Sequence, residues 1–377
     1  MTVLKPSPLE VGKRRMNRLT HRIHALPVLV LMPHSRCNCR CVMCDIWKAN
    51  QNQQELTTDD LAGHLESLRQ LQVRQVVLSG GEALMHSNLW KFCALLKELP
   101  ASITLLSTGL LLKKNAAEIL RWTDEVIVSL DGSPAVHDQI RNIPHAYARL
   151  AEGVAALKTL DPGFRVTARC TLQRNNFFDL PNIIATAHQL GLDQISFLAA
   201  DVSSEAFNRA QPWDAQHVSQ VALTPEETAR FSALLEETIR RCAGDFASGF
   251  IAESPGKLRR LVRYFAALNG QGEFPLNECN APWVSSVVEA DGTIRPCFFH
   301  PALGNLRQGG LEEILNSPAS VAFRQGLDVH TNPVCKKCVC TLNLSSRAAF
   351  ELREAQGEPG IHPPDPASPL DGRDGSA

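Results

Sequence analysis

Six short apolar segments alternate with amphipathic segments between residues 27 and 198. The apolar segments have the length of β-strands, and the segments between them carry apolar residues at helical spacing. This alternation is typical of a parallel sheet whose strands are joined by right-handed helical crossovers. The expected strands are 27–32, 75–79, 103–107, 125–130, 165–171 and 194–198, with helices at 61–71, 88–99, 113–122, 145–160 and 181–190.

Unusual polar residues follow four of these strands. Cysteines follow the first strand, Gly80–Glu82 the second, Thr108–Gly109 the third and Asp131–Gly132 the fourth. Sites built from the ends of many strands are typical of a (β/α) barrel, whereas an open sheet usually draws on fewer strands. Both folds fit the alternation, and we favour an α/β fold with a partial (β/α)6 TIM-type barrel. A small cysteine-rich C-terminal domain containing a β-hairpin is expected to follow it.

The rest of the chain divides by pattern into four further parts. Residues 1–26 form an N-terminal extension before the barrel at 27–203. Residues 204–275 read as a helical bridge, with helices at 224–241 and 255–268. Residues 276–345 form the cysteine-rich domain, whose hairpin turns at Asp291–Gly292 between 286–290 and 293–295. Residues 346–377 are expected to hold a helix end and a disordered tail rich in Pro, Gly, Asp and Ser.

The composition of the 377-residue chain excludes several classes of partner. The net charge of -1 gives no reason to expect a nucleic acid, and the basic run from Lys13 to Arg22 is more typical of a solvated helix face. No apolar run approaches the ~18 residues of a membrane span, and the N-terminus has no signal-peptide pattern. We therefore expect a cytoplasmic protein without a membrane span.

The twelve cysteines are clustered, which matters more than their number. In a reducing compartment disulfides are rare, so clustered cysteines there indicate metal or redox ligands. Four lie within Cys37–Cys44, and a second group follows in the C-terminal part. Its members are Cys279, Cys297, Cys335, Cys338 and Cys340, while Cys93, Cys170 and Cys242 stand alone.

The first group has the spacing C-x3-C-x2-C at Cys37, Cys41 and Cys44. Three thiolates this close in one loop can converge on one face of an iron–sulfur cluster and leave the fourth iron open. An open metal position can bind a substrate or cofactor. The alternative is a structural zinc site with Cys39 as fourth ligand, for which the spacing is awkward.

These residues also carry a family resemblance. The cysteine triplet, the stretch Cys41–Lys48 (CVMCDIWK), the Gly80–Gly81–Glu82 turn one βα unit later and the SLDG sequence at 129–132 together resemble the radical S-adenosylmethionine (SAM) superfamily. The resemblance extends over about residues 27 to 345. It implies a [4Fe–4S] cluster on Cys37, Cys41 and Cys44, with SAM chelated to the open iron.

The resemblance also implies which residues contact SAM. The Gly80–Glu82 loop would contact the methionine amino group, with Ser129 and Asp131 at the ribose. Arg169 matches a position that often pairs with the SAM carboxylate, although an ordinary ion pair explains it equally well. Met43 stands where many relatives have an aromatic residue near the adenine, and Thr108 where many have Asn. The implied contacts are Met43, Gly80, Gly81, Glu82, Thr108, Ser129, Asp131 and Arg169.

The chemistry implied by the family begins with one electron that passes through the cluster to SAM. The C5′–S bond then breaks, and the resulting 5′-deoxyadenosyl radical abstracts hydrogen from an unactivated C–H bond. The cofactor performs this step, while the protein supplies position and excludes water. An electron donor such as flavodoxin or ferredoxin is implied.

The second group suits a closed four-cysteine site, because a hairpin and a later C-x2-C can bring four thiolates together. Zinc also favours this arrangement. In context the segment resembles the SPASM and twitch domains, which carry auxiliary [4Fe–4S] clusters. No cysteine follows Cys340, so we expect one auxiliary cluster, with Cys340 able to replace one of the last two ligands. The expected ligands are Cys279, Cys297, Cys335 and Cys338.

We expect a small-molecule or cofactor-precursor substrate that is oxidised, epimerised or rearranged. A peptide- or protein-modifying maturase is one alternative, and a non-catalytic metal-binding structural module is another. Cys170 could return a hydrogen atom to a substrate radical if its thiol faces the cavity, whereas a buried core cysteine is the more ordinary role.

Overall fold

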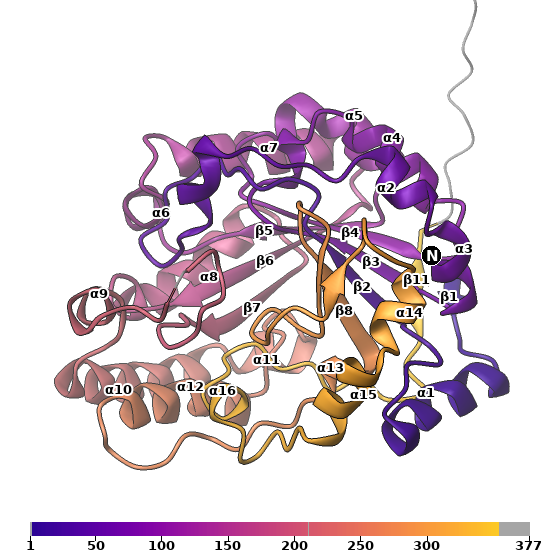
Figure 1. The fold of residues 1–377 in the computed structure, drawn as a ribbon. Helices are drawn as coiled ribbons and strands as arrows, with labels where there is room; N and C mark the ends of the chain where they lie inside the picture. The colour runs from indigo at the N-terminus through magenta and orange to yellow at the C-terminus, as the bar shows by residue number, and fades with distance from the viewer. Residues whose placement is uncertain (1, 210, 354–377) are drawn as a thin grey trace, which may run out of the picture.

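The computed structural model describes residues 2–209 and 211–353 of the chain. Its main element is a nine-stranded sheet with the order β10-β9-β8-β2-β3-β4-β5-β6-β7 (Figure 1). Strands β2 to β7 run parallel in sequence order, which confirms the expected partial (β/α)6 barrel. These strands are β2 (Val28–Leu31), β3 (Gln75–Leu78), β4 (Ser102–Ser107), β5 (Glu125–Ser129), β6 (Arg165–Leu172) and β7 (Gln194–Ala199).

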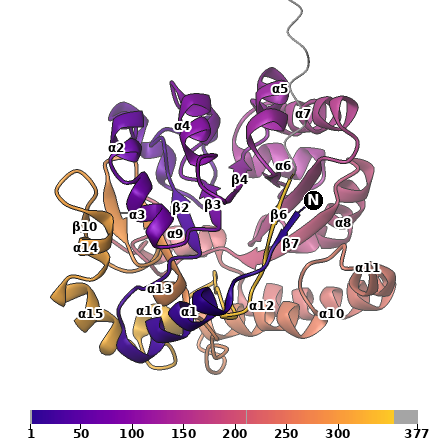
Figure 2. The same cartoon turned by 90° about the vertical axis from the view of Figure 1, so that its right-hand side faces the viewer.

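Helices connect the parallel strands and cover the outer face of the sheet (Figures 1 and 2). The helix expected at 61–71 is instead two short helices, because the chain leaves helical geometry at Gly63–His64, and glycine costs a helix about 1 kcal/mol relative to alanine. The connecting α-helices are α2 (Thr58–Ala62), α3 (Leu65–Gln70), α4 (Leu89–Leu96), α5 (Leu112–Trp122), α6 (Pro134–Arg141), α7 (Ala146–Leu160) and α8 (Leu180–Gln189). The 3-10 helices are η1 (Ile46–Gln51), η2 (Ala83–Met85) and η3 (Phe177–Asp179).

Each barrel strand turns alternate side chains towards the helices and towards the concave inner face, as strand geometry requires. On β6 the side chains of Ala168 and Cys170 are buried in the main hydrophobic core, whereas Arg169 is exposed. The register places Ser129 of β5 beside Arg169, and Arg169 beside Ser196 of β7. The inner face is therefore polar near the carboxyl ends of these strands.

The C-terminal segment extends the same sheet. Strands β8 (Ser285–Val288) and β9 (Thr293–Arg295) form the expected hairpin, and β10 (Gly304–Asn305) pairs with β9. Strand β8 also pairs in parallel with β2, so that Ser285 lies opposite Val28. The cysteine-rich segment therefore continues the barrel sheet. Its helices are α13 (Ala281–Val284), α14 (Leu311–Leu315), α15 (Pro318–Gln325) and α16 (Pro333–Lys336).

A helical segment joins β7 to the cysteine-rich segment. Its helices are α9 (Ala215–Val221), α10 (Pro225–Arg241), α11 (Ala243–Ser248) and α12 (Pro255–Leu268). Helices α10 and α12 confirm the two that the sequence predicts here. Thr224 and Glu227 form a capping box at the start of α10. Tyr264 of α12 donates to the Ala200 carbonyl 3.2 Å away, which fixes α12 beside β7.

The two ends of the described chain pair with each other. Strand β1 (Thr2–Leu4) lies antiparallel to β11 (Phe350–Leu352), as Figure 2 shows, and α1 (Pro8–Thr20) follows β1. The helix end expected from residue 346 is wrong over 350–352, because the backbone there is extended to meet the hydrogen-bonding edge of β1. The tail of residues 357–377, predicted to be disordered, lies outside the described residues.

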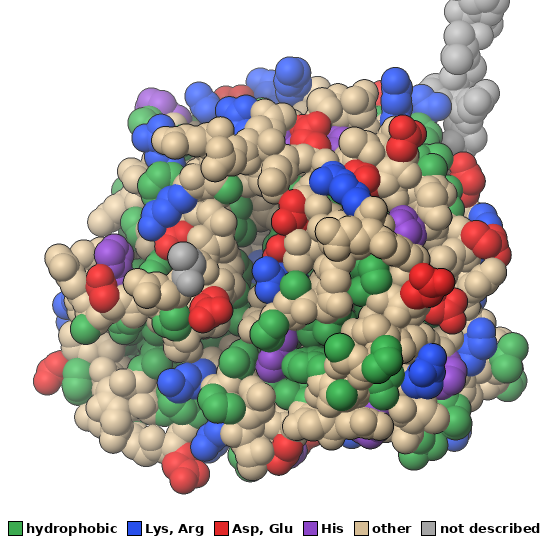
Figure 3. All heavy atoms as spheres, in the orientation of Figure 1, with side chains coloured by type: hydrophobic (Ala, Val, Ile, Leu, Met, Phe, Trp, Pro, Cys, Tyr) green, Lys and Arg blue, Asp and Glu red, His purple; other side chains and the backbone are tan. Residues whose placement is uncertain are grey.

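On the face of the molecule shown in Figure 3, acidic and basic side chains are interspersed with one another. Among residues 2–209 and 211–353, no helix combines the length and apolar character needed to cross a membrane.

Candidate functional site

The loop between β2 and η1 carries the first cysteine group. Cys41 is buried, and Cys37 and Cys44 are half-buried. Burial raises the pKa of the Cys37 thiol to about 12 and that of Cys44 to about 12, and the charge of Cys41 acts in the same direction on both. The three thiols predicted as cluster ligands therefore lie within electrostatic reach of one another.

Each of these three sulfurs has a hydrogen-bond donor from the protein. Arg141 Nη1 donates to Cys41 Sγ at 3.4 Å, and Ile46 N donates to Cys44 Sγ at 3.5 Å. The backbone N–H of Cys39 donates to Cys37. Donors of this kind favour the thiolate, which is the form that binds metal. The donor set therefore fits a cluster held by three thiolates.

Cys39, the alternative fourth ligand, has a different role in the structure. Its side chain is buried and hydrogen-bonds to the sulfur of Cys41, and this hydrogen bond is the main reason that the pKa of Cys41 falls to about 7. Nowhere in the described ranges do three Cys, His, Asp or Glu side chains converge closely enough to hold a single metal ion. An iron–sulfur cluster, in which each thiolate binds a different iron, stays the prediction for these thiols.

The Gly80–Glu82 turn packs directly against the cysteine loop. A β-carbon on Gly81 would lie 2.1 Å from the carbonyl oxygen of Arg36, and Gly80 has φ +108° with Met32 and His34 close by. Glu82 N donates to the same Arg36 oxygen at 2.9 Å. Glycine is therefore required at both positions, because the turn lies directly against the chain that leads into the cysteine loop. The turn after β3 fixes the loop that carries the cysteines.

Glu82 is fully buried and ties this turn to the end of β4. Its carboxylate accepts hydrogen bonds from Ser107 Oγ at 3.0 Å and from Thr108 N at 2.7 Å. Burial raises the pKa of Glu82 despite these donors. The Thr108 hydroxyl lies 2.6 Å from Glu82 Oε2 and 2.9 Å from Asn38 Oδ1, whereas the buried Asn38 Nδ2 has no protein partner. A buried amide without a partner is a feature of a site that takes a ligand.

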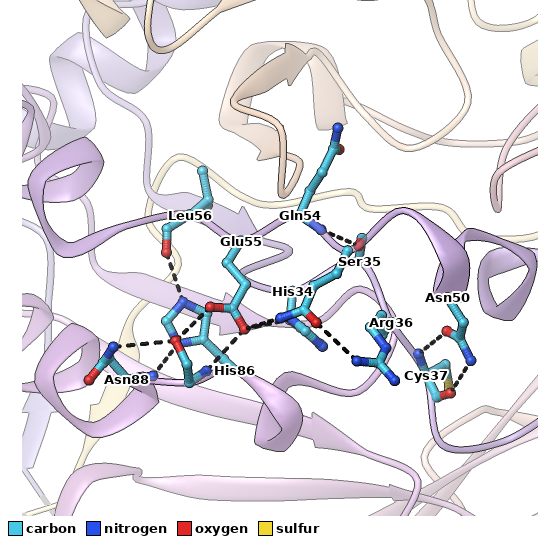
Figure 4. Close-up of polar contacts among 12 residues, drawn as sticks. His34, Ser35, Arg36, Cys37, Asn50, Gln54, Glu55, Leu56, His86 and Asn88 are labelled. Atoms are coloured by element: carbon cyan, nitrogen blue, oxygen red, sulfur yellow. Dashed lines mark hydrogen bonds and ion pairs between the residues drawn. The ribbon is translucent and has the colours of Figure 1, made fainter.

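A second segment holds the start of the cysteine loop from the other side. Asn50 forms two hydrogen bonds with the backbone of Cys37, donating to its carbonyl and accepting from its N–H, both at 2.9 Å (Figure 4). Glu55 Oε1 lies 2.9 Å from the buried His34 Nδ1. Residues 50–56, which we call the strap, thus fix Cys37 from outside the cysteine loop. The sequence motifs do not reveal this role of Asn50.

The predicted SAM contacts come from the ends of several barrel strands and from the cysteine loop. Ser129 is half-buried on the inner face, beside the ends of β3 and β4 that carry Gly80–Glu82 and Thr108. Arg169, the register partner of Ser129 on the same face, reaches towards β7, where its Nε donates to Ser196 Oγ at 3.3 Å. Met43 packs against the buried side chains of Ala200 and Val202, beyond the end of β7. Ser129, Thr108, Met43 and Arg169 stay predictions for the SAM site.

Asp131 does not present a free carboxylate. It is fully buried, forms an ion pair with Arg141 and accepts a hydrogen bond from Thr171 N at 2.8 Å. The ribose contact implied by the resemblance is therefore not supported by its surroundings. Arg141, which carries no motif signal of its own, links Asp131 to Cys41.

Cys170 faces the core rather than the inner face of the barrel. Its side chain is fully buried, Asn176 Nδ2 lies 3.7 Å from its sulfur, and burial raises the pKa of its thiol well above the ordinary value. Strand alternation explains the orientation, since its neighbour Arg169 takes the inner face. The cavity-facing geometry that a hydrogen donor needs is absent at this residue.

The second cysteine group gathers around the hairpin. Cys279 precedes α13, Cys297 follows β9, and Cys335 lies in α16. The charges of Cys279 and Cys335 act on Cys297, and those of Cys297 and Cys279 act on Cys338. Burial raises the pKa of Cys335 to about 11 and that of Cys297 to about 12. The four predicted ligands thus lie in one region around the hairpin and stay predictions.

Two further residues support this second group. Asn277 Nδ2 donates to the carbonyls of Cys335 and Cys338, at 2.7 and 3.0 Å. His300 Nε2 lies 3.2 Å from Cys335 Sγ. Cys340 is exposed, and its carbonyl oxygen lies 3.2 Å from the Cys338 sulfur. The same feature recurs in both cysteine groups, where an asparagine from another segment fixes the backbone of a ligand.

A cavity of about 110 Å³ lies between the barrel and the second cysteine group. Its wall includes Arg169 of β6, Tyr264 of α12, and both Cys338 and Cys340. The charged residues of the wall are Arg169, Glu253, Lys257, Arg260 and Lys336. Four of these five are basic, so the cavity is suited to an anion.

Two sequence profiles match this chain at the two cysteine groups. The profile of the radical SAM superfamily matches residues 31–187, and that of the SPASM iron–sulfur cluster-binding domain matches residues 279–339. The chain belongs to the radical SAM superfamily. Its SPASM segment is the part that extends the barrel sheet through β8 and β9.

Relatives of this radical SAM protein include the antilisterial bacteriocin subtilosin biosynthesis protein AlbA of Bacillus subtilis, 23% identical over 312 residues. The match covers 81% of this chain and 63% of AlbA, so less than two thirds of AlbA is represented. The AdoMet-dependent heme synthase of Methanosarcina barkeri is 24% identical over 74% of this chain and 78% of the synthase. Native anSMEcpe with bound AdoMet and Cp18Cys peptide shares the fold, with a TM-score of 0.59 and 17% identity over 82% of this chain and 87% of that one.

Membership in the radical SAM superfamily, together with the SPASM segment, defines the cofactors of this enzyme. They are a [4Fe–4S] cluster with SAM in the barrel, and auxiliary iron–sulfur in the SPASM segment. When bound, these groups would supply reductive cleavage of SAM and removal of a hydrogen atom from a C–H bond. The described residues fit these groups, through the thiols and their donors in both cysteine groups and through the unpartnered Asn38 amide.

Proposed function

We propose that this enzyme removes a hydrogen atom from a small molecule or cofactor precursor that carries a carboxylate. The carboxylate would bind in the cavity between β6 and the SPASM cysteines, and the bond to be activated would lie over the inner face of the barrel. The observation that carries the proposal is the wall of that cavity, which joins Arg169 of the barrel to Cys338 of the second cysteine group.

The charges around the cavity favour an anion. The Arg169 guanidinium is exposed, and in the described chain its side chain makes one hydrogen bond, to Ser196. Lys257 and Lys336 are also exposed at the wall. The one carboxylate, Glu253, is buried, accepts a hydrogen bond from Phe197 N at 2.9 Å and lies 3.8 Å from Lys257. Arg169 is thus available for the bidentate binding that a carboxylate favours.

The size of the cavity limits what enters it. A volume of about 110 Å³ holds one short carboxylate-bearing arm, and the remainder of a larger substrate must lie over the inner face of the barrel. Arg169 then orients the substrate, and the apolar side chains of Leu198 and Leu261 exclude water from part of the wall. The reactive carbon is fixed relative to the SAM site by this contact.

A peptide substrate is the second candidate. The related protein AlbA is named for bacteriocin biosynthesis, and the structural neighbour anSMEcpe was solved with a bound peptide. The heme synthase among the relatives supports the small-molecule candidate in the same way. An acidic side chain of a peptide offers the cavity the same carboxylate, so both candidates share its chemistry.

The test uses anaerobically reconstituted enzyme, SAM and dithionite with two deuterated panels, one of small carboxylic acids and one of acidic peptides. Deuterium that passes from a small acid into 5′-deoxyadenosine supports the proposal, and transfer from peptides alone supports the second candidate. No 5′-deoxyadenosine from either panel indicates a non-catalytic module.

Arg169→Gln tests the cavity. The lost charge-assisted hydrogen bonds should raise KM for the labelled acid about 10- to 100-fold. Arg263→Gln, an exposed arginine of α12 outside the cavity, is the matched control and should leave KM unchanged. An equal KM for the acid in the wild type and the Arg169 variant would show that the carboxylate binds elsewhere.

We also propose a cytoplasmic location and a flavodoxin or ferredoxin as electron donor, because free thiols and low-potential clusters need a reducing compartment.

A further inference from the structure

Arg141 is a buried cation in direct contact with a cluster ligand. It ends α6, and its side chain is 8% exposed. Nη1 donates to Cys41 Sγ at 3.4 Å, and Nη2 forms an ion pair with the fully buried Asp131. One guanidinium therefore spans a thiolate ligand of the cluster and a carboxylate at the end of β5.

The backbone around Arg141 holds the same cysteine. Arg40 N donates to the Arg141 carbonyl at 3.0 Å, and Val42 N donates to the Ile140 carbonyl at 3.2 Å. The residues on both sides of Cys41 are thus hydrogen-bonded to the end of α6. Cys41 can shift only if the end of α6 shifts with it.

Asp131 is held as firmly as the arginine. Thr171 N donates to its Oδ1 at 2.8 Å, and Asn176 Nδ2 donates to its backbone carbonyl at 2.9 Å. Arg141 Nη2 donates a hydrogen bond to Oδ2 of Asp131. Both carboxylate oxygens are therefore used within the protein, and the Arg141–Asp131 pair is fixed relative to Cys41.

Buried charges next to a cluster ligand act on its reduction. Reduction adds one electron, and so one negative charge, to the cluster, while the external donor is oxidised by one electron. A guanidinium that donates to a ligand sulfur favours the reduced state, and a nearby carboxylate opposes it. The opposite charges of Arg141 and Asp131 therefore set the balance between the reduced and the oxidised cluster.

We propose that the Arg141–Asp131 pair positions Cys41 and sets the reduction potential of the cluster on Cys37, Cys41 and Cys44. Asp131 then acts through Arg141 and makes no contact with the SAM ribose. This role depends on the cluster and not on the identity of the substrate, so its failure leaves the carboxylate cavity untouched.

The test is a redox titration of the reconstituted wild type, Arg141→Gln, Asp131→Asn and the double variant, followed by electron paramagnetic resonance with dithionite as reductant. Arg141→Gln should shift the reduction equilibrium about tenfold towards the oxidised cluster, or about 59 mV to more negative potential. Asp131→Asn should shift it the opposite way, because the cation is no longer balanced. The double variant should return towards the wild type.

A second set of variants separates positioning from folding. Arg141→Lys keeps the charge and should recover most of the potential but lose cluster to a chelator faster, since lysine cannot hold Cys41 and Asp131 with one planar fork. Arg149→Gln, an exposed arginine of α7, is the matched control. Iron content and circular dichroism establish that each variant is folded and loaded.

Two results would overturn the role. One is the same potential in all loaded variants, which shows that the pair does not act on the cluster. The other is an Asp131→Asn variant with unchanged potential but weaker SAM binding, measured by calorimetry, which returns Asp131 to the cofactor site.

Discussion

Gly81 leaves no room for a side chain, because the carbonyl of Arg36 lies where a β-carbon would be. The sequence shows the Gly-Gly-Glu turn, and the family resemblance explains the glycines by their approach to SAM. The structure adds a second reason, since both glycines pack against the cysteine loop. The motif therefore identifies the two glycines, but it does not reveal that the cysteine loop also requires them.

Gly81→Ala should displace the cysteine loop and lower the iron bound at the first cysteine group. The overpacking costs about 1–3 kcal/mol of stability. Gly12→Ala is the control, because nothing lies within 4 Å of a β-carbon there and alanine favours the helix α1. Iron analysis and thermal unfolding measure both effects, and equal iron in the two variants would contradict the close approach.

Cys170→Ala should leave the yield and stereochemistry of the product unchanged, because the thiol is buried in the core. The loss of a buried sulfur should lower stability by about 1 kcal/mol. Product analysis and denaturant unfolding are the measurements. A product epimerised by the wild type but not by the variant would restore Cys170 as a hydrogen donor.

Spacing indicates the cysteine ligands, because they lie close together in sequence or in recognisable halves. Spacing does not indicate Arg141, which is 100 residues from Cys41, or Asn277, which is 58 residues from Cys335. Such partners become visible only when the fold brings their elements together. Arg169 shows the converse, since the sequence predicts it as a site residue but only the structure shows that its side chain donates to Ser196 of the neighbouring strand.

At the level of elements, alternating apolar patterns predict the six barrel strands and the hairpin. They do not predict that β8 pairs with β2, because no local pattern states which strand edge another strand will meet. The strap is also invisible in the pattern, since its hydrogen bonds to the cysteine loop come from polar residues without periodicity. Gly63 is a local signal for the break between α2 and α3. The helical spacing of the leucines on both sides of it nevertheless led to the prediction of a single helix.

Asn50→Ala tests the strap. Loss of its two hydrogen bonds to Cys37 should cost about 1–2 kcal/mol and speed the removal of iron from the first cysteine group by a chelator. Gln51→Ala, at the exposed neighbouring position, should behave like the wild type. Chelation rates followed by visible absorbance give the comparison, and equal rates in all three proteins would show that the strap does not fix Cys37.

At the level of the whole molecule, one sheet carries both cysteine groups. The first group follows β2 at its carboxyl end, and the second surrounds the hairpin of β8, the strand paired with β2. The cavity lined by Arg169 and Cys338 lies between the barrel strands β6 and β7, helix α12 and residues 336–341. The two sites are thus fixed relative to each other by backbone hydrogen bonds.

The reconstituted wild type should contain about eight irons per chain, as two four-iron clusters. The double variant Cys279→Ala/Cys297→Ala should contain about four and still cleave SAM under dithionite, because the first group is intact. Iron and sulfide analysis with 5′-deoxyadenosine quantification checks this. Zinc without sulfide in the wild type would instead indicate a structural metal module.

The pairing of Val28 with Ser285 has a consequence for the order of folding. During synthesis β2 emerges first, yet one of its edges stays open until more than 250 further residues have been made. Contacts of such long sequence separation form slowly, and domains fold as the chain leaves the ribosome. We therefore expect the segment that leads from β2 into the cysteine loop to be fixed only after the hairpin has been translated, since Met32 N donates to the Val288 carbonyl. Iron–sulfur assembly on this chain is then expected to follow translation, so a nascent chain arrested before residue 285 should not retain the first cluster.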